Sequence, residues 1–272
     1  MEQTFETSGR TSLYVEIGSG DVNVRADEES HVVVRVEGDG AEDTTVEQRG
    51  DRIVVIGPQR TGFFGGARGL DVHVSMPHDS DLATKLGSAD LVVTGAIGSA
   101  SLKSGSGDVQ IEAANDEVQV ESGSGDITLG VVAGDLRVKS GSGDVTLQEL
   151  GGAGSISTGS GDVELTHTSG DVQMKTGSGS LRVRQPEGDV ALSTASGDLT
   201  VDRMSAGQLA AKNVSGDIRV GVPDGVPVWT DISTLSGSVR SNLQGAGQPA
   251  EGEPFLELRA KTVSGDIYLD QR

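Results

Sequence analysis

A tetrad of the form Ser-Gly-Asp-Val returns along this chain every 18 residues, and this period constrains the fold more than any other feature. Its acidic position is occupied by Asp90, Asp108, Asp126, Asp144 and Asp162, then by Ser180, and then by Asp198. The spacing afterwards widens to 19, 21 and 28 residues, at Asp217, Ser238 and Asp266. An earlier copy, at 18–22, stands alone near the N-terminus. A fixed period of this length is typical of stacked structural repeats.

Each repeat divides into two halves of nine residues, and each half contains an apolar-x-apolar triplet. Two such triplets are Leu136-Arg137-Val138 and Val145-Thr146-Leu147. This alternation predicts a short strand with two side chains inside and one outside. Nine residues are too few for a helix with its turns, and the abundance of Gly and Ser also disfavours a helix. We therefore expect two short strands and two tight turns in each repeat.

The apolar positions of successive repeats form columns that could fill a shared interior, because short strands bury their apolar faces best by stacking on the next copy. One column holds Val109, Ile127, Val145, Val163, Leu181, Leu199, Ile218, Val239 and Ile267. Aliphatic and largely β-branched residues suit a narrow core between parallel sheets. The sequence predicts an all-β fold: a parallel β-helix, or β-solenoid, with 18-residue coils.

The strict period covers only part of the chain, which we divide into three regions. Residues 1–80 show strand-like alternation without the period, and we expect an irregular β cap that is continuous with the solenoid. Residues 81–222 predict the regular solenoid. Residues 223–272 predict looser C-terminal rungs with a long loop at 241–254.

Composition narrows the possible partners and the location. The net charge of −20 opposes binding to DNA, RNA and anionic lipid. The absence of cysteine excludes disulfides and thiolate metal sites. Residues 1–20 lack the basic and apolar segments of a signal peptide, and no apolar run approaches a membrane span. The sequence therefore predicts a cytoplasmic location without membrane insertion.

Two interpretations of the repeated Asp stay open. If successive rungs place the carboxylates of Asp108, Asp126, Asp144 and Asp162 about 5 Å apart, the charges repel unless they are screened or bridged. A ladder of Ca²⁺ ions could bridge them, as in nonapeptide β-rolls. In the alternative, each carboxylate accepts hydrogen bonds from turn amides and binds no metal. The sequence indicates no other cofactor.

Aromatic residues are scarce, so their positions are candidate contacts. Phe63 and Phe64 lie in a glycine-rich segment, and Trp229 is the only tryptophan. These three could form an interaction site; alternatively they pack over the ends of the solenoid, with Phe255 and Trp229 as lids.

Catalytic patterns are missing. The four histidines, His31, His73, His78 and His167, lack metal-ligand spacing, and neither a nucleophile elbow nor a phosphate loop is found. We expect a protein that is not an enzyme.

The Ser-Gly-Asp-[Val/Ile/Leu] repeat, preceded by Val72-His73-Val74-Ser75-Met76-Pro77, resembles a bacterial family of putative adhesins, a domain of unknown function with β-strand repeats. The resemblance implies a right-handed parallel β-helix and carries no catalytic residues over.

The function predicted on these grounds is a non-catalytic interaction or scaffold module for an unknown protein or envelope component. Two alternatives remain: a Ca²⁺-dependent binding domain that uses the Asp ladder, and a self-assembling rod. The corresponding states are a monomer or an end-to-end oligomer.

Overall fold

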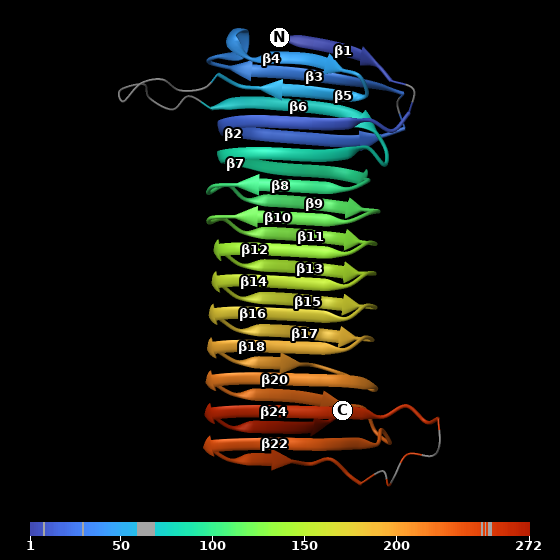
Figure 1. Cartoon of the computed structure of the whole chain (residues 1–272), viewed down its shortest axis with the longest axis vertical. Helices are drawn as coiled ribbons and strands as arrows, with labels where there is room; N and C mark the ends of the chain where they lie inside the picture. The colour runs from blue at the N-terminus through green and yellow to red at the C-terminus, as the bar shows by residue number, and fades with distance from the viewer. Residues whose placement is uncertain (8, 29, 59–68, 246, 248, 250–251) are drawn as a thin grey trace. The chain divides into compact units, whose positions relative to one another are not determined.

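The computed structural model describes residues 1–7, 9–28, 30–58, 69–245, 247, 249 and 252–272. Apart from the 3-10 helix η1 (Ala41–Asp43), the regular elements of this described part are strands (Figure 1). The chain separates into two units: a first unit of residues 1–134 with 139–142, and a second unit of residues 135–138 with 143–272. Both units are built from stacked rungs, which confirms the predicted β-solenoid. The boundaries predicted at residues 80 and 222 stay predictions.

The first unit has two sheets that share their long strands. One sheet runs in the spatial order β4, β5, β2, β7, β8, β10, and the other in the order β1, β3, β6, β2, β7, β9, β11. The bounds of these strands are β1 (Glu2–Glu6), β2 (Ser12–Asp27), β3 (His31–Gly38), β4 (Thr45–Arg49), β5 (Arg52–Ile56), β6 (Leu70–Pro77), β7 (Asp81–Ile97), β8 (Ala100–Ser104), β9 (Val109–Ala114), β10 (Val118–Ser122) and β11 (Ile127–Val132).

The isolated Ser-Gly-Asp copy near the N-terminus stacks directly on the first of the regular repeats. Strand β2 pairs with β7 in parallel, so that Asp21 lies beside Asp90, although 69 residues separate them. The intervening residues include β3, β4, β5 and β6. Strands β3 and β4 run antiparallel to their neighbours β6 and β5, and β1 runs antiparallel to β3. The first strands of this unit therefore depart from the parallel stacking of the repeats.

In the second unit all pairings between rungs are parallel. One sheet runs in the order β14, β16, β18, β20, β24, β22, and the other in the order β13, β15, β17, β19, β21, β25, β23. The bounds are β12 (Leu136–Ser142), β13 (Val145–Leu150), β14 (Gly154–Ser160), β15 (Val163–Thr168), β16 (Val172–Ser178), β17 (Leu181–Pro186), β18 (Val190–Ser196), β19 (Leu199–Val201), β20 (Gly207–Ser215), β21 (Ile218–Val222), β22 (Val228–Ser236), β23 (Val239–Ser241), β24 (Leu256–Ser264) and β25 (Ile267–Gln271).

The last two rungs of the second unit are stacked in the reverse of their sequence order. Ile267 of β25 lies between Ile218 of β21 and Val239 of β23. The prediction that rungs stack in sequence order is therefore wrong beyond Asp217. The chain skips one level, forms β22 and β23, and then fills the gap with β24 and β25 (Figure 1). A long connection makes such a return possible at a small cost in loop entropy.

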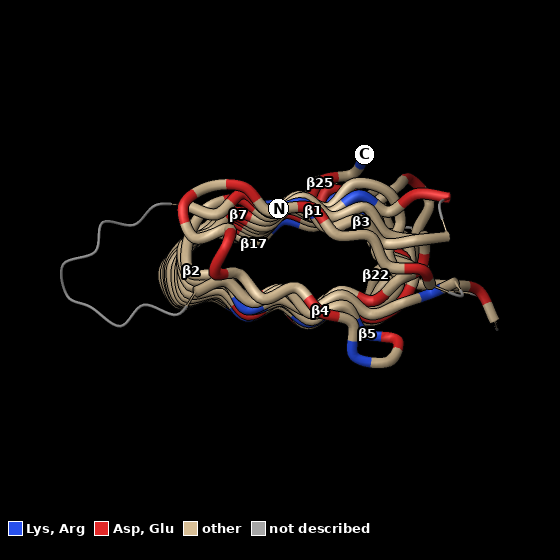
Figure 2. Tube along the Cα trace, turned by 90° about the horizontal axis from the view of Figure 1, so that it is seen from above, with Lys and Arg blue, Asp and Glu red and all other residues tan. Residues whose placement is uncertain are grey.

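The predicted apolar columns form the core. Each rung is a flattened loop with strands on two opposed sides (Figure 2), and the apolar side chains point between them. Val163, Leu181 and Ile267 are at most 1% exposed. Such narrow packing explains why aliphatic residues of medium size suffice and aromatic residues are few.

The second glycine of each Ser-Gly-Asp turn is required by the stacking itself. Gly161 has a φ of +136°, and a Cβ placed on it would lie 2.1 Å from the carbonyl oxygen of Gly143, one rung away. The earlier glycine of the turn does not need positive φ, since Ala195 and Val214 occupy that position in later rungs.

Candidate functional site

The repeated Asp side chains tie consecutive turns together. In the first unit, Oδ1 of Asp90 accepts the amide N–H of Asp108 at 2.9 Å, and Oδ1 of Asp108 accepts that of Asp126 at 2.8 Å. In the second unit, Oδ1 of Asp144 accepts the amide of Asp162 at 2.8 Å, and Oδ1 of Asp162 accepts that of Ser180 at 2.7 Å. The turn-capping interpretation of the Asp positions is confirmed at these sites.

At the calcium ladder predicted at Asp108, Asp126, Asp144 and Asp162, the described residues form no metal-binding cluster. Among the described residues, no group of three or more His, Cys, Asp or Glu side chains is arranged to hold a metal ion. One oxygen of Asp108 and one of Asp162 is already engaged by an amide. Calcium binding at the ladder stays a prediction.

Of the three aromatic candidates, the structure describes only Trp229. Phe63 and Phe64 lie outside the residues that the structure describes. Trp229 begins the outer face of β22, is 52% exposed, and has the Arg259 guanidinium 5.9 Å from its ring centroid. Trp229 therefore lies beside the sheet and does not cover the core as a lid.

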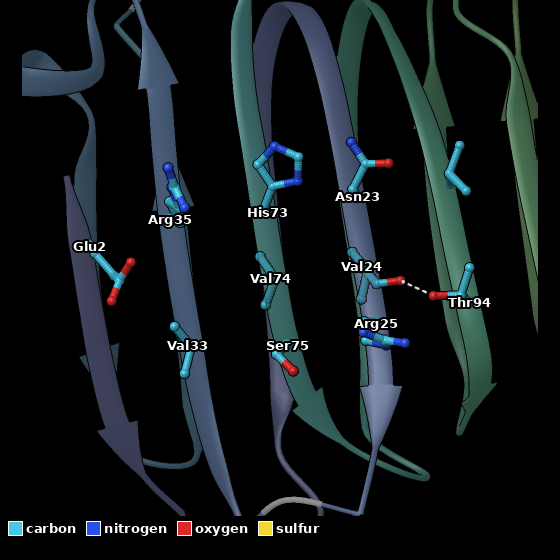
Figure 3. Close-up of a pocket in the computed structure, with 11 residues that line it drawn as sticks. Glu2, Asn23, Val24, Arg25, Val33, Arg35, His73, Val74, Ser75 and Thr94 are labelled. Carbon is cyan, nitrogen blue, oxygen red and sulfur yellow. Dashed lines mark hydrogen bonds between the residues drawn. The ribbon is translucent and has the colours of Figure 1, made fainter.

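A shallow concavity of about 350 Å³ lies on the outer face of the first unit, over five neighbouring strands (Figure 3). Its central residues come from β6 and β2, where the outward side chains alternate with the buried Val72, Val74, Val22 and Val24. This site was not predicted from the sequence.

The strand register arranges the lining side chains in two rows. The first row crosses the strands β1, β3, β6, β2 and β7 as Glu2, Arg35, His73, Asn23 and Val92. The second row crosses β3, β6, β2 and β7 as Val33, Ser75, Arg25 and Thr94. Directly opposite residues in a sheet have Cβ atoms about 5 Å apart, so the rows bring donors from four strands within reach of one ligand.

The polar groups of this concavity differ in how far they are already engaged. The Ser75 hydroxyl donates to Oδ2 of Asp27 at 2.6 Å, and Nε of Arg35 donates to Oε1 of Glu37 at 2.7 Å. Arg25 and His73, in contrast, have no partner within the described part of the chain. Both are exposed. The concavity therefore presents a guanidinium and an imidazole whose hydrogen-bonding capacity is available.

The chemistry that this arrangement supports is recognition of an anion. A guanidinium offers a planar fork of donors that matches a carboxylate or phosphate, and a second arginine and an imidazole adjoin it. The only acidic lining residue is Glu2, at the rim on β1. Arg25 is thus the guanidinium available at this face, since Arg35 is held by Glu37.

The sequence contained part of the signal for this face. The segments Val22-Asn23-Val24-Arg25 and Val72-His73-Val74-Ser75 both alternate apolar and polar residues, which predicts that the four polar side chains point outward. The sequence alone does not show that β6 lies beside β2. Leu70 comes 43 positions after Asp27, and no repeat between them fixes the register. His167 lies within β15, with Nε2 3.7 Å from Oε1 of Glu187.

No helix in the described part of the chain is both long and apolar enough to cross a bilayer.

A family model matches nearly the whole chain. The family model described as "Toastrack DUF4097" matches residues 11–270. No curated protein matches the sequence. A putative cell adhesion protein from Clostridium sporogenes is similar over 100% of this chain and 99% of its own, at 14% identity and a TM-score of 0.25.

Two further solved structures are similar. A putative adhesin from Bacteroides fragilis has 10% identity and a TM-score of 0.35, over 99% of this chain and 96% of its own. A putative lipid binding protein from Parabacteroides distasonis has 12% identity and a TM-score of 0.37, with the same coverage of 99% and 96%.

Proposed function

The chain belongs to the Toastrack DUF4097 family, and from this premise we propose that it is a non-catalytic interaction module whose ligand is a carboxylate-bearing group of a protein or envelope component. The ligand-binding site is the concavity on the outer face of the first unit. The observation that carries the proposal is the diagonal placement of two available donors, Arg25 and His73, on adjacent strands of that face.

Charge supports the choice of ligand. A molecule with an excess of acidic residues repels most anions, so an anion is held only where cationic side chains gather. Arg25 and Arg35 lie there, on strands fixed by the continuous backbone ladder, and the imidazole of His73 adds a further hydrogen-bonding group. The predicted exclusion of nucleic acid is compatible with this site, because three basic side chains cannot offset the overall repulsion of a polyphosphate.

Shape supports binding over catalysis. The concavity is open to solvent, and the donors that line it are exposed. Catalytic groups usually act in sites that exclude water and shift pKa values. An open sheet face is better suited to an extended ligand that contacts several strands at once.

The test uses the whole chain and two probes that carry carboxylates, a poly-glutamate peptide and an oligo-galacturonate. We expect one of them to bind, and Arg25→Ala to weaken that binding by about tenfold, as for the loss of one charge-assisted hydrogen bond. Arg137→Ala is the matched control, since Arg137 is an exposed arginine on an outer strand position of the second unit. Failure of both probes to bind, or equal losses in the two variants, would contradict the proposal.

A calcium-dependent form of the module, with ions at Asp108, Asp126, Asp144 and Asp162, remains a separate prediction. Calorimetry and a melting curve at millimolar Ca²⁺ test it, because an ion that binds only the folded state releases or absorbs heat and raises the melting temperature. The cytoplasmic location also stays a prediction.

A further inference from the structure

The last rung of the second unit has a neighbour on one side only. Within the described part of the chain, β22 pairs with β24 and β23 pairs with β25, and neither pairs with any other strand. Its inner positions are therefore open. Val239 is 48% exposed, whereas Ile267, at the equivalent position of the adjacent rung, is fully buried. A groove of about 480 Å³ lies here, lined on one side by inner residues of the rung such as Val228, Ile232 and Val239, and on the other by Leu243, Gln244, Gly245 and Gly247 of the segment that follows it.

The outer face of β22 adds two large exposed apolar side chains. Trp229, near its start, is 52% exposed, and Leu235, near its end, is 83% exposed. Leu235 also continues a column of exposed apolar residues, since it lies beside Val263, the next rung's residue at the same turn position. Exposed apolar surface of this kind at a strand edge is typical of a surface that pairs with another chain.

The positions of Trp229 and Leu235 are self-complementary. If two copies of β22 run antiparallel with Ile232 opposite Ile232, the paired positions sum to 464, so Trp229 of one copy lies opposite Leu235 of the other. In the same register Asp231 lies opposite Ser233, so the acidic residue does not meet itself, and Thr230 lies opposite Thr234. An aromatic residue opposite an aliphatic one is a favourable cross-strand pair.

Charge favours a second copy of the chain at this rung. Residues 228–241 contain one acid, Asp231, and one base, Arg240, so the rung is neutral in a chain of net charge −20. Both charges are engaged within the unit: Asp231 lies 3.0 Å from Nζ of Lys261, and Arg240 lies 3.8 Å from Asp266. The rung also has neither a proline nor an inward-pointing charge within its strands, the devices by which edge strands commonly avoid pairing.

The turn of this rung has no further rung stacked on it within the described part of the chain. In a regular rung the side-chain oxygen at this position accepts the amide of the next rung, as Oγ of Ser180 does from Asp198 at 3.4 Å. Oγ of Ser238 accepts no such amide among the described residues, and its hydroxyl instead helps to lower the pKa of Asp266. The series of hydrogen bonds between turns therefore ends at this rung.

We propose that the free edge of β22 binds β22 of a second copy of this chain, antiparallel and centred on Ile232, and forms a closed dimer. The pairing continues the sheet across the two copies, covers the open core positions, and buries Trp229 against Leu235. It does not involve the anion-binding face of the first unit, so it holds or fails independently of the proposed function.

Sedimentation velocity over a wide range of protein concentration tests the proposal. We expect a monomer–dimer equilibrium, and we expect Leu235→Lys to raise its dissociation constant at least tenfold. Val214→Lys is the matched control, because Val214 is a 54% exposed residue of the same turn column away from the edge, and it should leave the equilibrium unchanged. A monomer at every concentration would overturn the proposal, as would open-ended growth or equal effects of the two variants.

Cross-linking tests the register. The chain has no cysteine, so Ile232→Cys supplies a single thiol at the centre of the proposed pair. Opposed residues of antiparallel strands have Cα atoms about 4.5–5.5 Å apart, within the range of a disulfide. We expect oxidation to give a covalent dimer for Ile232→Cys and only monomer for Ser193→Cys, on the outer face of β18. If the wild-type chain dimerises but Ile232→Cys gives no covalent dimer, the proposed register is wrong.

Discussion

The first strands of the first unit and the last rung of the second unit solve the problem of ending a solenoid differently. In the first unit, β3 and β4 turn back antiparallel onto β6 and β5, and the core beneath them is closed, with Val36 and Ile53 fully buried. In the second unit, β22 and β23 stack parallel like any other rung, and Val239 stays 48% exposed. Parallel stacking thus propagates a core but does not close it, whereas an antiparallel return can do both.

The two regions also differ in the charge of their outermost strands. The outermost strands of the first unit, β1 and β4, carry Glu2, Glu6, Glu47 and Arg49, which discourage pairing with another strand. Strand β22 carries only Asp231. The exposed edge of the second unit is therefore the one that can pair, and the closed region of the first unit is the one that can present a stable binding face.

The largest expected difference in stability is between two valines of the same apolar column, one in an inner rung and one in the last rung. Val163→Ala removes buried methyl groups from a rung packed on both sides, and we expect it to cost about 2 kcal/mol of unfolding free energy. Val239→Ala makes the same change at the open rung, and we expect less than about 0.5 kcal/mol in the monomer. Chemical denaturation of both variants at low protein concentration measures the contrast. Equal losses would show that the last rung is as closed as the others.

The Asp ladder supplies a smaller contrast. Asp162→Ala leaves the amide of Ser180 without its acceptor, and we expect a loss of about 1 kcal/mol, since the site is exposed and water can replace part of the bond. Ser238→Ala removes an oxygen that accepts no amide from a further rung among the described residues, and we expect a smaller loss in the monomer than for Asp162→Ala. Asp162→Ser is a useful third variant, because Ser180 performs the same role one rung later. Equal losses of stability in Asp162→Ala and Ser238→Ala would contradict this contrast.

The smallest effect is a pH dependence of the last rung. The amide of Ser238 and the hydroxyl of Tyr268 donate to Asp266 and hold its pKa below the ordinary value of 3.8. A carboxyl whose pKa is lowered on folding stabilises the fold above its unfolded pKa, and that contribution is lost as the pH falls through the folded pKa. Hydrogen exchange at Ser238 should therefore speed up below the ordinary range of Asp, relative to intrinsic exchange.

The matched control for this effect is Asp266→Asn, which keeps the shape of the side chain and removes its titration. It should show the same relative protection of the Ser238 amide at each acidic pH. A wild-type protein with the same behaviour would mean that the Asp266 carboxyl does not hold the rung.

The sequence predicts those parts of the fold that depend on local, repeated signals. The column around Val163 and the turns at Asp108 and Asp162 follow from the 18-residue period and from alternation, and both are found. The order of Ile267 and Val239 does not follow, because spacing tells how long a connection is and not which level it reaches. A longer loop can lead onward or back with nearly the same entropy.

The binding face of the first unit escaped sequence analysis for a related reason. Outward positions for Arg25 and His73 follow from alternation, but their proximity depends on the pairing of β2 with β6, which a turn-rich, unrepeated segment separates. Register between strands that are distant in sequence is set by the packing of both faces and has no local signature. The central residues of the site therefore become visible only in three dimensions.

The order of the last rungs is the claim on which the comparison of the two regions depends, and paired cysteines test it directly. Lys212 of β20 lies beside Lys261 of β24, and Ser233 of β22 lies on the far side of Lys261. We predict that the double variant Lys212→Cys with Lys261→Cys forms an intramolecular disulfide on mild oxidation, and that Lys212→Cys with Ser233→Cys does not. Rapid cross-linking of the 212 and 233 pair, with none for 212 and 261, would show that the rungs stack in sequence order and would contradict the account.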